Sequence, residues 1–231
     1  MKTLDYYIKE ALIKKDTKIK TYNQYPKDKE ELRALLETIL TEKNKDADLN
    51  DIDTSHITDM QMLFNDLDPH NIDISRWDVS NVEDMQYMFF GCKNFNCNLN
   101  KWNVKKVKNM EGMFGNCHNF NGDISDWDVS NVENMIELFY NCKSFNGDLG
   151  KWNVKKVTQM IQMFDNCEKF EGNGLENWDV SNVKEMQWMF NKCTNLKCDL
   201  SNWEDTCDKS SFNMFHECPL IKKYPYWYKE L

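Results

Sequence analysis

A repeat of 25 residues limits what this 231-residue chain can fold into more than any other feature. Methionine, phenylalanine and cysteine return in register in DMQYMFFGCKNF (84–95), NMEGMFGNCHNF (109–120) and NMIELFYNCKSF (134–145). A period in the twenties is typical of solenoids, in which stacked coils bury an apolar surface that no single coil could bury alone. We therefore predict an α/β fold, a solenoid of stacked coils.

Within each repeat, the spacing of the apolar residues changes along the chain. Three- and four-residue steps in SNVEDMQYMFFGC (80–92) predict a helix with one buried stripe, made of Val82, Met85, Met88, Phe89 and Cys92. Ser80 and Glu83 match the capping box of a helix start. The stretch FNGDIS (120–125) alternates apolar and polar residues, which predicts a short parallel strand. Each coil is therefore expected to contain one short parallel strand and one helix.

The repeats divide the chain into three expected parts. Residues 1–46 form a helical N-terminal cap, residues 47–218 a solenoid of about seven repeats, and residues 219–231 a C-terminal cap. A solenoid needs caps because its two end coils would otherwise expose apolar surface.

The terminal segments have patterns that suit such caps. KDKEELRALLETILTE (27–42) follows Pro26, a residue favoured at the start of a helix, and this helix is expected to cover the first coil. LDYYIKEALIKK (4–15) is expected to be a second amphipathic helix, with a partner-binding peptide as the alternative. CPLIKKYPYWYKEL (218–231) either folds over the last coil or is an exposed aromatic docking segment.

One repeat is a residue longer than the others. It has FEGNGLENW (170–178) where the preceding repeat has FNGDLGKW (145–152). Its two glycines suit a small loop or bulge that leaves the neighbouring coils in register.

Six of the nine cysteines return at the same position of successive repeats. A residue that returns once per coil occupies an equivalent place in each coil, so we interpret these six as buried, reduced, small apolar side chains. A metal cluster is the alternative, but the chain has no C-x-x-C motif and no Cys/His pair at ligand spacing. The six are Cys92, Cys117, Cys142, Cys167, Cys193 and Cys218.

Catalytic motifs are absent from the sequence. The four histidines share no repeat position, and there is no nucleophile elbow, P-loop, dinucleotide fingerprint or zincin motif. Asp73, Asp123 and Asp148 recur in register and are interpreted as turn residues, with calcium binding in the turns as the alternative. We expect a protein that is not an enzyme and that needs neither cofactor nor metal.

Charge and hydropathy exclude further classes. A net charge of −9 and a pI near 5.0 argue against a nucleic-acid-binding protein. The mean hydropathy is −0.75 and apolar runs are short, so no membrane association is expected. The first twenty residues lack the apolar region of a signal peptide, which predicts a cytoplasmic protein, in the host cytoplasm or virion if the source is viral. A cell-surface location is the alternative if an export signal was removed.

A second period runs beneath the first, because WDVSNV and WNVKKV turns alternate. Opposite charges such as those of Glu83 and Lys108 therefore fall on adjacent coils, where they stabilise by tenths of a kcal/mol. Four lysines of the WNVKKV turns are either solvated and balanced by neighbouring coils, or form two basic stripes that hold a phosphate or an acidic partner. They are Lys105, Lys106, Lys155 and Lys156.

The repeated pattern FN-x-DLS-x-WDVSNV-x-x-M-x-x-MF-x-x-C resembles that of the BspA-like leucine-rich-repeat family, in its Met-, Phe- and Trp-rich branch. FNGDISDWDVSNVENMIELFYNC (120–142) and NGLENWDVSNVKEMQWMFNKC (173–193) match it, and DLNDIDTSHITDMQMLF (48–64) matches the way such arrays begin. The resemblance covers residues 47–218. It implies a leucine-rich-repeat-like solenoid and a binding function, with no catalytic residues. Members occur in bacteria, protists and large DNA viruses, and several bacterial members are cell-surface adhesins.

Asn96, Asn121 and Asn146 follow phenylalanine in three successive coils. They resemble the asparagine ladders of leucine-rich repeats, in which stacked amides bond backbone groups of the turns. We expect this role to be structural.

Six large apolar residues lie between the buried positions of the expected helices, where an exposed helix face would normally be polar. They are Tyr87, Phe90, Ile136, Tyr140, Ile161 and Trp188. Either they pack against the adjacent coil, or they form a patch that binds a protein. The leading hypothesis is a non-catalytic, monomeric protein-binding scaffold with a protein partner of unknown identity. The alternative is a cell-surface or virion structural component that acts in adhesion or self-assembly.

Overall fold

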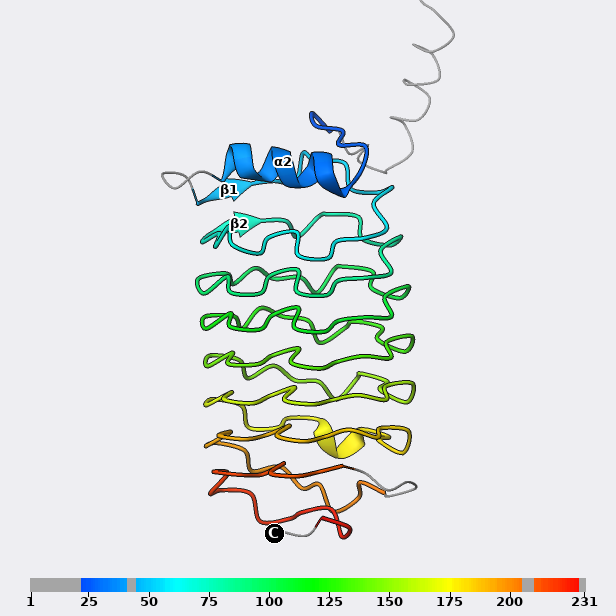
Figure 1. The fold of residues 1–231 in the computed structure, drawn as a ribbon, viewed down its shortest axis with the longest axis vertical. Coiled ribbons are helices and arrows are strands. Elements are labelled where there is room, and N and C mark those ends of the chain that lie inside the picture. The colour runs from blue at the N-terminus through cyan, green and yellow to red at the C-terminus, as the bar shows by residue number, and fades with distance from the viewer. Residues whose placement is uncertain (1–21, 41–44, 205–209, 229–231) are drawn as a thin grey trace, which may run out of the picture.

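The computed structural model describes residues 22–40, 45–204 and 210–228, which form a tall stack of coils (Figure 1). Equivalent residues of neighbouring coils are joined by parallel bridges, so each coil lies directly over the next. The bridges link, in order, Asp59, Asp84, Asn109, Asn134, Gln159, Glu185 and Ser210. The predicted 25-residue register is therefore confirmed, and so is its single step of 26 residues.

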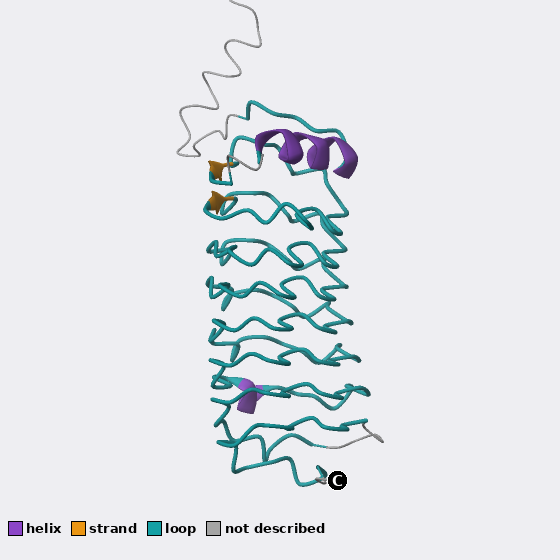
Figure 2. Ribbon diagram, turned by 60° about the vertical axis from the view of Figure 1, so that its left-hand side comes forward, coloured by secondary structure: helices purple, strands orange, loops and turns teal. Residues whose placement is uncertain are grey.

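In the described residues, strands longer than one residue are confined to the first two coils. β1 (Ala47–Asp48) and β2 (Ile72–Asp73) pair in parallel, with Ala47 opposite Ile72. Residues 120–125, where a strand was expected, have turns and unassigned backbone instead. Loops and turns make up most of the stack (Figure 2).

The prediction of one helix in each coil is wrong. Residues 80–92 form consecutive tight turns, in one of which the Met88 N–H donates to Met85 O at 3.2 Å. Tyr87 and Gly91 have φ values of 53° and 78°, which a right-handed helix does not contain. A turn closed by a bond from residue i to residue i+3 spaces its ends three residues apart. A run of such turns therefore places apolar residues at the same steps as a helix does.

The predicted capping box is wrong for the same reason, because no helix follows it. The Ser80 N–H donates to the Asp78 carboxylate at 3.0 Å, and Ser130 repeats this contact with Asp128 at 3.2 Å. These are Asx turns, in which an aspartate side chain bonds the backbone two residues on.

The residues predicted to fill the core are buried, and their rings stack from coil to coil. Phe114 and Phe139 have ring centroids 5.7 Å apart and an interplanar angle of 3°. Trp127 and Trp152 stack at 6.2 Å, and the Trp152 Nε1–H donates to Ile124 O of the preceding coil at 3.1 Å. The stripe predicted from the sequence has no exposed surface; it consists of Val82, Met85, Met88, Phe89 and Cys92.

The six repeat cysteines lie in the same core, so their predicted burial is confirmed. The Cys142 thiol donates to Phe114 O of the preceding coil at 2.9 Å. That carbonyl also accepts the Cys117 N–H within its own turn, so the thiol bonds the second lone pair. Burial raises the pKa of Cys142, and the thiol therefore keeps its proton at neutral pH.

Backbone hydrogen bonds between coils run mainly in one direction. Over residues 85–91, every second N–H donates to the following coil, as Tyr87 does to Glu111 O at 2.7 Å. Bonds in the opposite direction are fewer, and one joins the Lys108 N–H to Glu83 O at 2.9 Å. The first coil consequently presents carbonyl oxygens at its free side, and the last coil presents N–H groups.

Helix α2 (Lys29–Ile39) covers the end that presents carbonyls (Figure 1). A helix was predicted here, but it begins after Asp28, whose side chain accepts the Glu31 N–H, rather than at Pro26. Leu32 and Leu36 are its buried residues.

Arg33 of α2 bonds the carbonyls that no earlier coil can reach. Its Nη1 donates to the oxygens of Met62, Leu63 and Asn65 at 3.3, 3.0 and 2.7 Å. A cation is the appropriate partner for a row of carbonyl dipoles, as at the C-terminus of a helix. The helix predicted at 4–15 lies outside the described residues.

At the other end, residues 218–228 pack against the last coil. Lys223 forms a parallel bridge with Asp199, and the rings of Tyr224 and Tyr228 contact Phe215 with centroids 5.1 and 4.8 Å apart. The described helices are too short and too polar to cross a bilayer.

Candidate functional site

Three positions in each coil vary from coil to coil, and most of their side chains are only partly buried. In the coil that starts at Asp84 they are Gln86, Tyr87 and Phe90, which are only partly buried. All six apolar residues selected from the sequence belong to these columns. We call this surface the outward face. It comprises Gln61, Met62, Asn65, Gln86, Tyr87, Phe90, Glu111, Gly112, Gly115, Ile136, Glu137, Tyr140, Ile161, Gln162, Asp165, Gln187, Trp188, Asn191, Phe212, Asn213 and His216.

Tyr87 and Phe90 are held against the following coil. Their rings meet edge to face with centroids 5.3 Å apart, and the Tyr87 hydroxyl donates to Glu111 Oε1 at 2.6 Å. A Cβ at Gly112 would lie 2.2 Å from the Tyr87 ring, and one at Gly115 would lie 2.7 Å from the Phe90 ring. These two aromatics therefore pack against a neighbouring coil, as the first of the two alternatives expected, and only part of each ring faces outward.

The four later apolar residues lie on four consecutive coils together with Phe212. Ile136 and Tyr140 belong to one coil, Ile161 to the next and Trp188 to the third. Trp188 meets the ring of Phe212 edge to face at 5.6 Å, and Phe212 is 51% exposed. This part of the outward face thus offers apolar surface to the surroundings.

Three carboxylates stand on consecutive coils of the same face: Glu111, Glu137 and Asp165. The Glu137 carboxylate has no hydrogen-bond donor and no cation within ion-pair distance among the described residues. Burial, followed by the charges of Glu111 and Asp165, raises the pKa of Glu137. Asp165 is 6% exposed and accepts the side-chain amides of Asn191 at 2.8 Å and of Gln162 at 3.0 Å. Negative charge is therefore concentrated here without a compensating cation.

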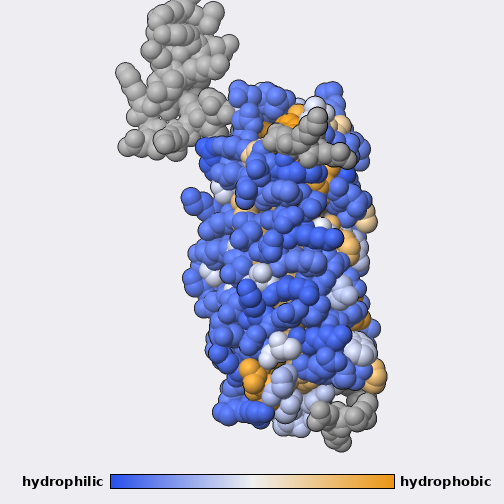
Figure 3. Space-filling model, turned by 90° about the vertical axis from the view of Figure 1, so that its left-hand side faces the viewer, coloured by the Kyte–Doolittle hydropathy of each residue, from blue (hydrophilic) through white to orange (hydrophobic). Residues whose placement is uncertain are grey.

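Elsewhere on the stack, several charged residues are paired between adjacent coils. Lys108 bonds Glu83 at 2.8 Å, as the sequence predicted, and Lys143 bonds Glu168 at 2.9 Å. The side on which β1 and β2 lie is largely hydrophilic (Figure 3). The outward face differs from these surfaces in composition and in charge balance.

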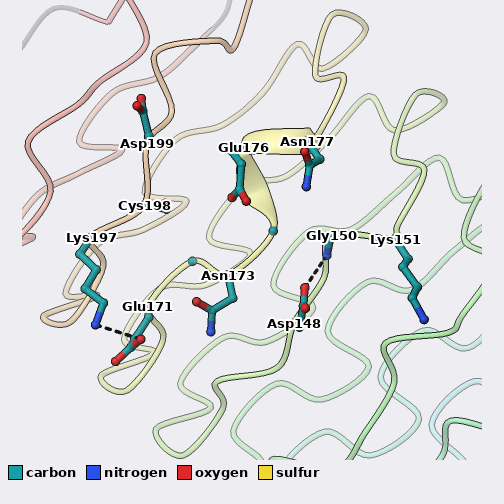
Figure 4. A pocket seen from close by; sticks show the side chains of 12 residues that line it. Asp148, Gly150, Lys151, Glu171, Asn173, Glu176, Asn177, Lys197, Cys198 and Asp199 are labelled. Carbon is teal, nitrogen blue, oxygen red and sulfur yellow. Dashed lines mark hydrogen bonds and ion pairs between the residues drawn. The ribbon is translucent and has the colours of Figure 1, made fainter.

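A shallow hollow of about 750 Å³ lies beside the 26-residue repeat (Figure 4). Gly172 and Gly174 have φ values of 87° and 86°, and the chain then forms the 3₁₀ helix η1 (Leu175–Asn177). Trp152 and Trp178 still stack at 6.4 Å, so the predicted bulge that preserves register is confirmed.

The rim of the hollow carries charges of both signs. Lys197 pairs with Glu171 at 3.0 Å, and Asp148 accepts the Gly150 N–H at 2.9 Å (Figure 4). Asp148 is thus a turn residue, as predicted. Among the described residues, no group of three or more His, Cys, Asp or Glu side chains could hold a metal ion.

The lysines of the WNVKKV turns are bonded to neighbouring coils, as the first interpretation expected. Lys106 Nζ donates to Asn81 Oδ1 at 2.6 Å, and Lys156 repeats this with Asn131. Lys105 and Lys155 lie 3.9 and 3.7 Å from the carboxylates of Asp128 and Asp179.

The predicted asparagine ladder is confirmed. Asn96 Oδ1 accepts the Asn121 N–H at 2.9 Å, and Asn121 Oδ1 accepts the Asn146 N–H at 2.8 Å. The side-chain amides therefore bond the backbone of the following coil, which is a structural role.

Sequence reasoning found the apolar residues of the outward face but missed its carboxylates and amides. Glu137 falls in the same column as Tyr87, Gly112 and Trp188, so alignment of the repeats by column would have found it. Large apolar side chains alone do not reveal this part of the face, because its other members are acidic residues and amides.

A family model described as "Mycoplasma protein of unknown function, DUF285" matches residues 34–148 and residues 120–227. The two matches overlap and together span more than half of the chain, which is consistent with a family of repeats. No curated protein matches the chain.

Proposed function

Because the chain belongs to the DUF285 family, whose description names no activity, we propose its function from the surface that the coils build. In this proposal the protein is a non-catalytic scaffold that binds another protein through the outward face. The BspA-like branch and a leucine-rich-repeat-like solenoid are part of the same proposal, on the strength of the repeat pattern. The free cysteines of the described residues suit the cytoplasmic location that we also propose.

The observation that carries the proposal is the placement of apolar surface on four consecutive coils. A stack can bury its apolar residues inside, so an exposed Phe212 beside the half-buried Trp188 needs another reason. Contiguous apolar patches on soluble proteins mark interaction sites, and aromatic residues carry a large share of interface energy. The surrounding polar residues resemble the rim of such a site.

The test compares capture of a partner from the native cell by two double variants. Tyr140→Ser with Trp188→Ser changes the outward face, and Lys106→Ser with Lys156→Ser is the matched control on the turns. We expect the first pair to weaken binding of the captured protein at least tenfold, or ~1.4 kcal/mol, and the control to leave it unchanged.

Two measurements keep this test decisive. If the first pair unfolds the protein, Phe212→Ser replaces it, because that side chain is already half exposed. If a folded variant captures the same partner with unchanged affinity, the outward face is not the binding site. Concentration-dependent self-association by light scattering, lost in the same variants, would favour the structural or adhesion role instead.

A further inference from the structure

The outward face has three carboxylates without the ion pairs that some other columns form. Lys108 and Lys143 each pair with a glutamate of an adjacent coil. Glu111, Glu137 and Asp165 have no lysine or arginine within ion-pair distance among the described residues. Like charges on adjacent levels of a ladder repel each other, so the arrangement is unfavourable for the isolated stack.

Two buried side-chain oxygens on the same face can accept hydrogen bonds but have no donor among the described residues. Asn191 is 6% exposed; its Nδ2 donates to Asp165, but its Oδ1 has no donor. Gln187 Oε1, in the same coil, also has no donor. Buried acceptors without a partner are rare in folded proteins. This observation is independent of the carboxylates, and it indicates a local lack of hydrogen-bond donors beside Asp165.

Aromatic rings flank these acceptors. Tyr140 shares a coil with Glu137, and Trp188 lies between Gln187 and Asn191 in the sequence. The faces of Trp and Tyr rings attract lysine and arginine side chains, and arginine adds several donors in a planar group. A metal ion would not use the rings, and the described carboxylates do not form a metal-binding group.

We propose that the occupant of the outward face is a cationic segment of a partner protein, whose lysine or arginine side chains bind Glu111 and Glu137 beside the buried carboxylate of Asp165, while its apolar side chains contact Tyr140 and Trp188. This inference rests on the proposed function and adds the chemistry of the partner. Coils repeat at about 4.8 Å, so the three carboxylates on consecutive coils span about 10 Å along the axis of the stack. About three residues of an extended chain cover that length.

The test uses two short fluorescent peptides, one alternating arginine with leucine and one alternating glutamate with leucine. Binding is measured by fluorescence anisotropy at physiological salt, because screening suppresses weak long-range attraction. Glu111→Gln with Glu137→Gln is compared with Glu83→Gln with Glu168→Gln. Both pairs remove two negative charges, so the net charge of the protein is matched.

We expect the arginine peptide to bind, the outward pair to weaken it at least tenfold, and the control pair to weaken it less than twofold. The pKa of Glu137, followed by NMR, should fall when the arginine peptide is bound. Equal weakening by both pairs would show attraction by net charge alone and overturn the inference. Binding of the glutamate peptide, or of neither peptide, would also overturn it.

This experiment is separable from the test of the proposed function. If neither peptide binds while Tyr140→Ser with Trp188→Ser still abolishes partner capture, the protein-binding role stands and only the cationic partner is wrong. If the arginine peptide binds as expected but that pair leaves capture intact, the native partner docks elsewhere.

Discussion

The inward columns of the stack, whose side chains are buried, repeat one residue type, whereas the outward columns change residue type from coil to coil. The two kinds of column nevertheless alternate within the same few residues of each coil. The inward column at Met85 continues with Met110, Met135 and Met160, all with no exposed surface. The outward column at Tyr87 continues with Gly112, Glu137 and Gln162. An inward side chain has a copy of itself as its neighbour, so one residue type that packs well serves every coil.

Most outward side chains are only partly buried, so an outward position is free to differ from coil to coil. Where it is large, the next coil compensates: Tyr87 and Phe90 are followed by Gly112 and Gly115. Variation in a repeat protein thus marks where it meets something other than itself. If the two kinds of column are independent, a substitution in an outward column should leave the packing of the inward columns intact.

The largest expected contrast lies between two adjacent residues. Phe139→Ala should lower the free energy of unfolding by ~3–5 kcal/mol, because it opens a cavity between stacked rings. Tyr140→Ala should lower it by about 1 kcal/mol or less, as at a partly exposed site. Urea denaturation measures both. Similar losses for the two variants would show that the outward column is part of the core.

A second test probes the contact between coils on the outward face. Gly112→Ala should destabilise by ~1–3 kcal/mol, because the new methyl group meets the Tyr87 ring and φ is +56°. Adding Tyr87→Ala should recover part of that loss, since it removes the ring. A double-mutant cycle with no coupling between the two positions would contradict the packing described here.

The cysteine column offers a smaller effect. Cys142→Ala should cost ~1–2 kcal/mol through a small cavity and the lost bond to Phe114 O. Cys97→Ala should cost less, because the contact of its thiol with Asn98 O is long, at 3.7 Å. Alkylation adds a second readout: Cys142 should react only on unfolding. Rapid labelling of Cys142 in the native protein would refute its burial.

The smallest effect concerns Glu137, which we expect to weaken the fold when ionised. Its pKa is raised in the folded state, so the native protein binds its proton more tightly than the unfolded chain does. The free-energy cost of ionising Glu137 in the folded protein is absent below the usual glutamate pKa of about 4.3. It appears as the pH rises through the pKa of the folded state. Glu137→Gln should therefore stabilise by ~0.2–1 kcal/mol at pH 7 and by nothing near pH 3. Thermal melts at both pH values measure this, with Glu168→Gln as the control that should not stabilise.

The period and the buried residues could be predicted from the sequence because they depend only on which residues return in register. Val82 and Phe89 were assigned to the core correctly. The local conformation could not be predicted, since tight turns and a helix share three-residue steps. Left-handed residues decide between them, and Tyr87, Glu137 and Trp188 adopt such φ values without being glycine. Stacking on the next coil overrides their local preference.

The outward face was only half predictable for a related reason. Hydropathy identified Tyr140 and Trp188, but the lack of a partner at Glu137 depends on which columns face each other in space. The leucine-rich-repeat class and the protein-binding role stay predictions.

The prevailing direction of the backbone hydrogen bonds between coils has a consequence for the length of the molecule. Every coil donates to the one after it and accepts from the one before it, so a coil inserted between two others meets the same groups on both sides. Insertion by twos also preserves charge pairs such as Lys108 with Glu83. The contacts of Arg33 with the first coil would not change. Two added coils would lengthen the stack by about 10 Å, and descendants of one ancestral array could thus reach partners of different size while keeping the same two ends.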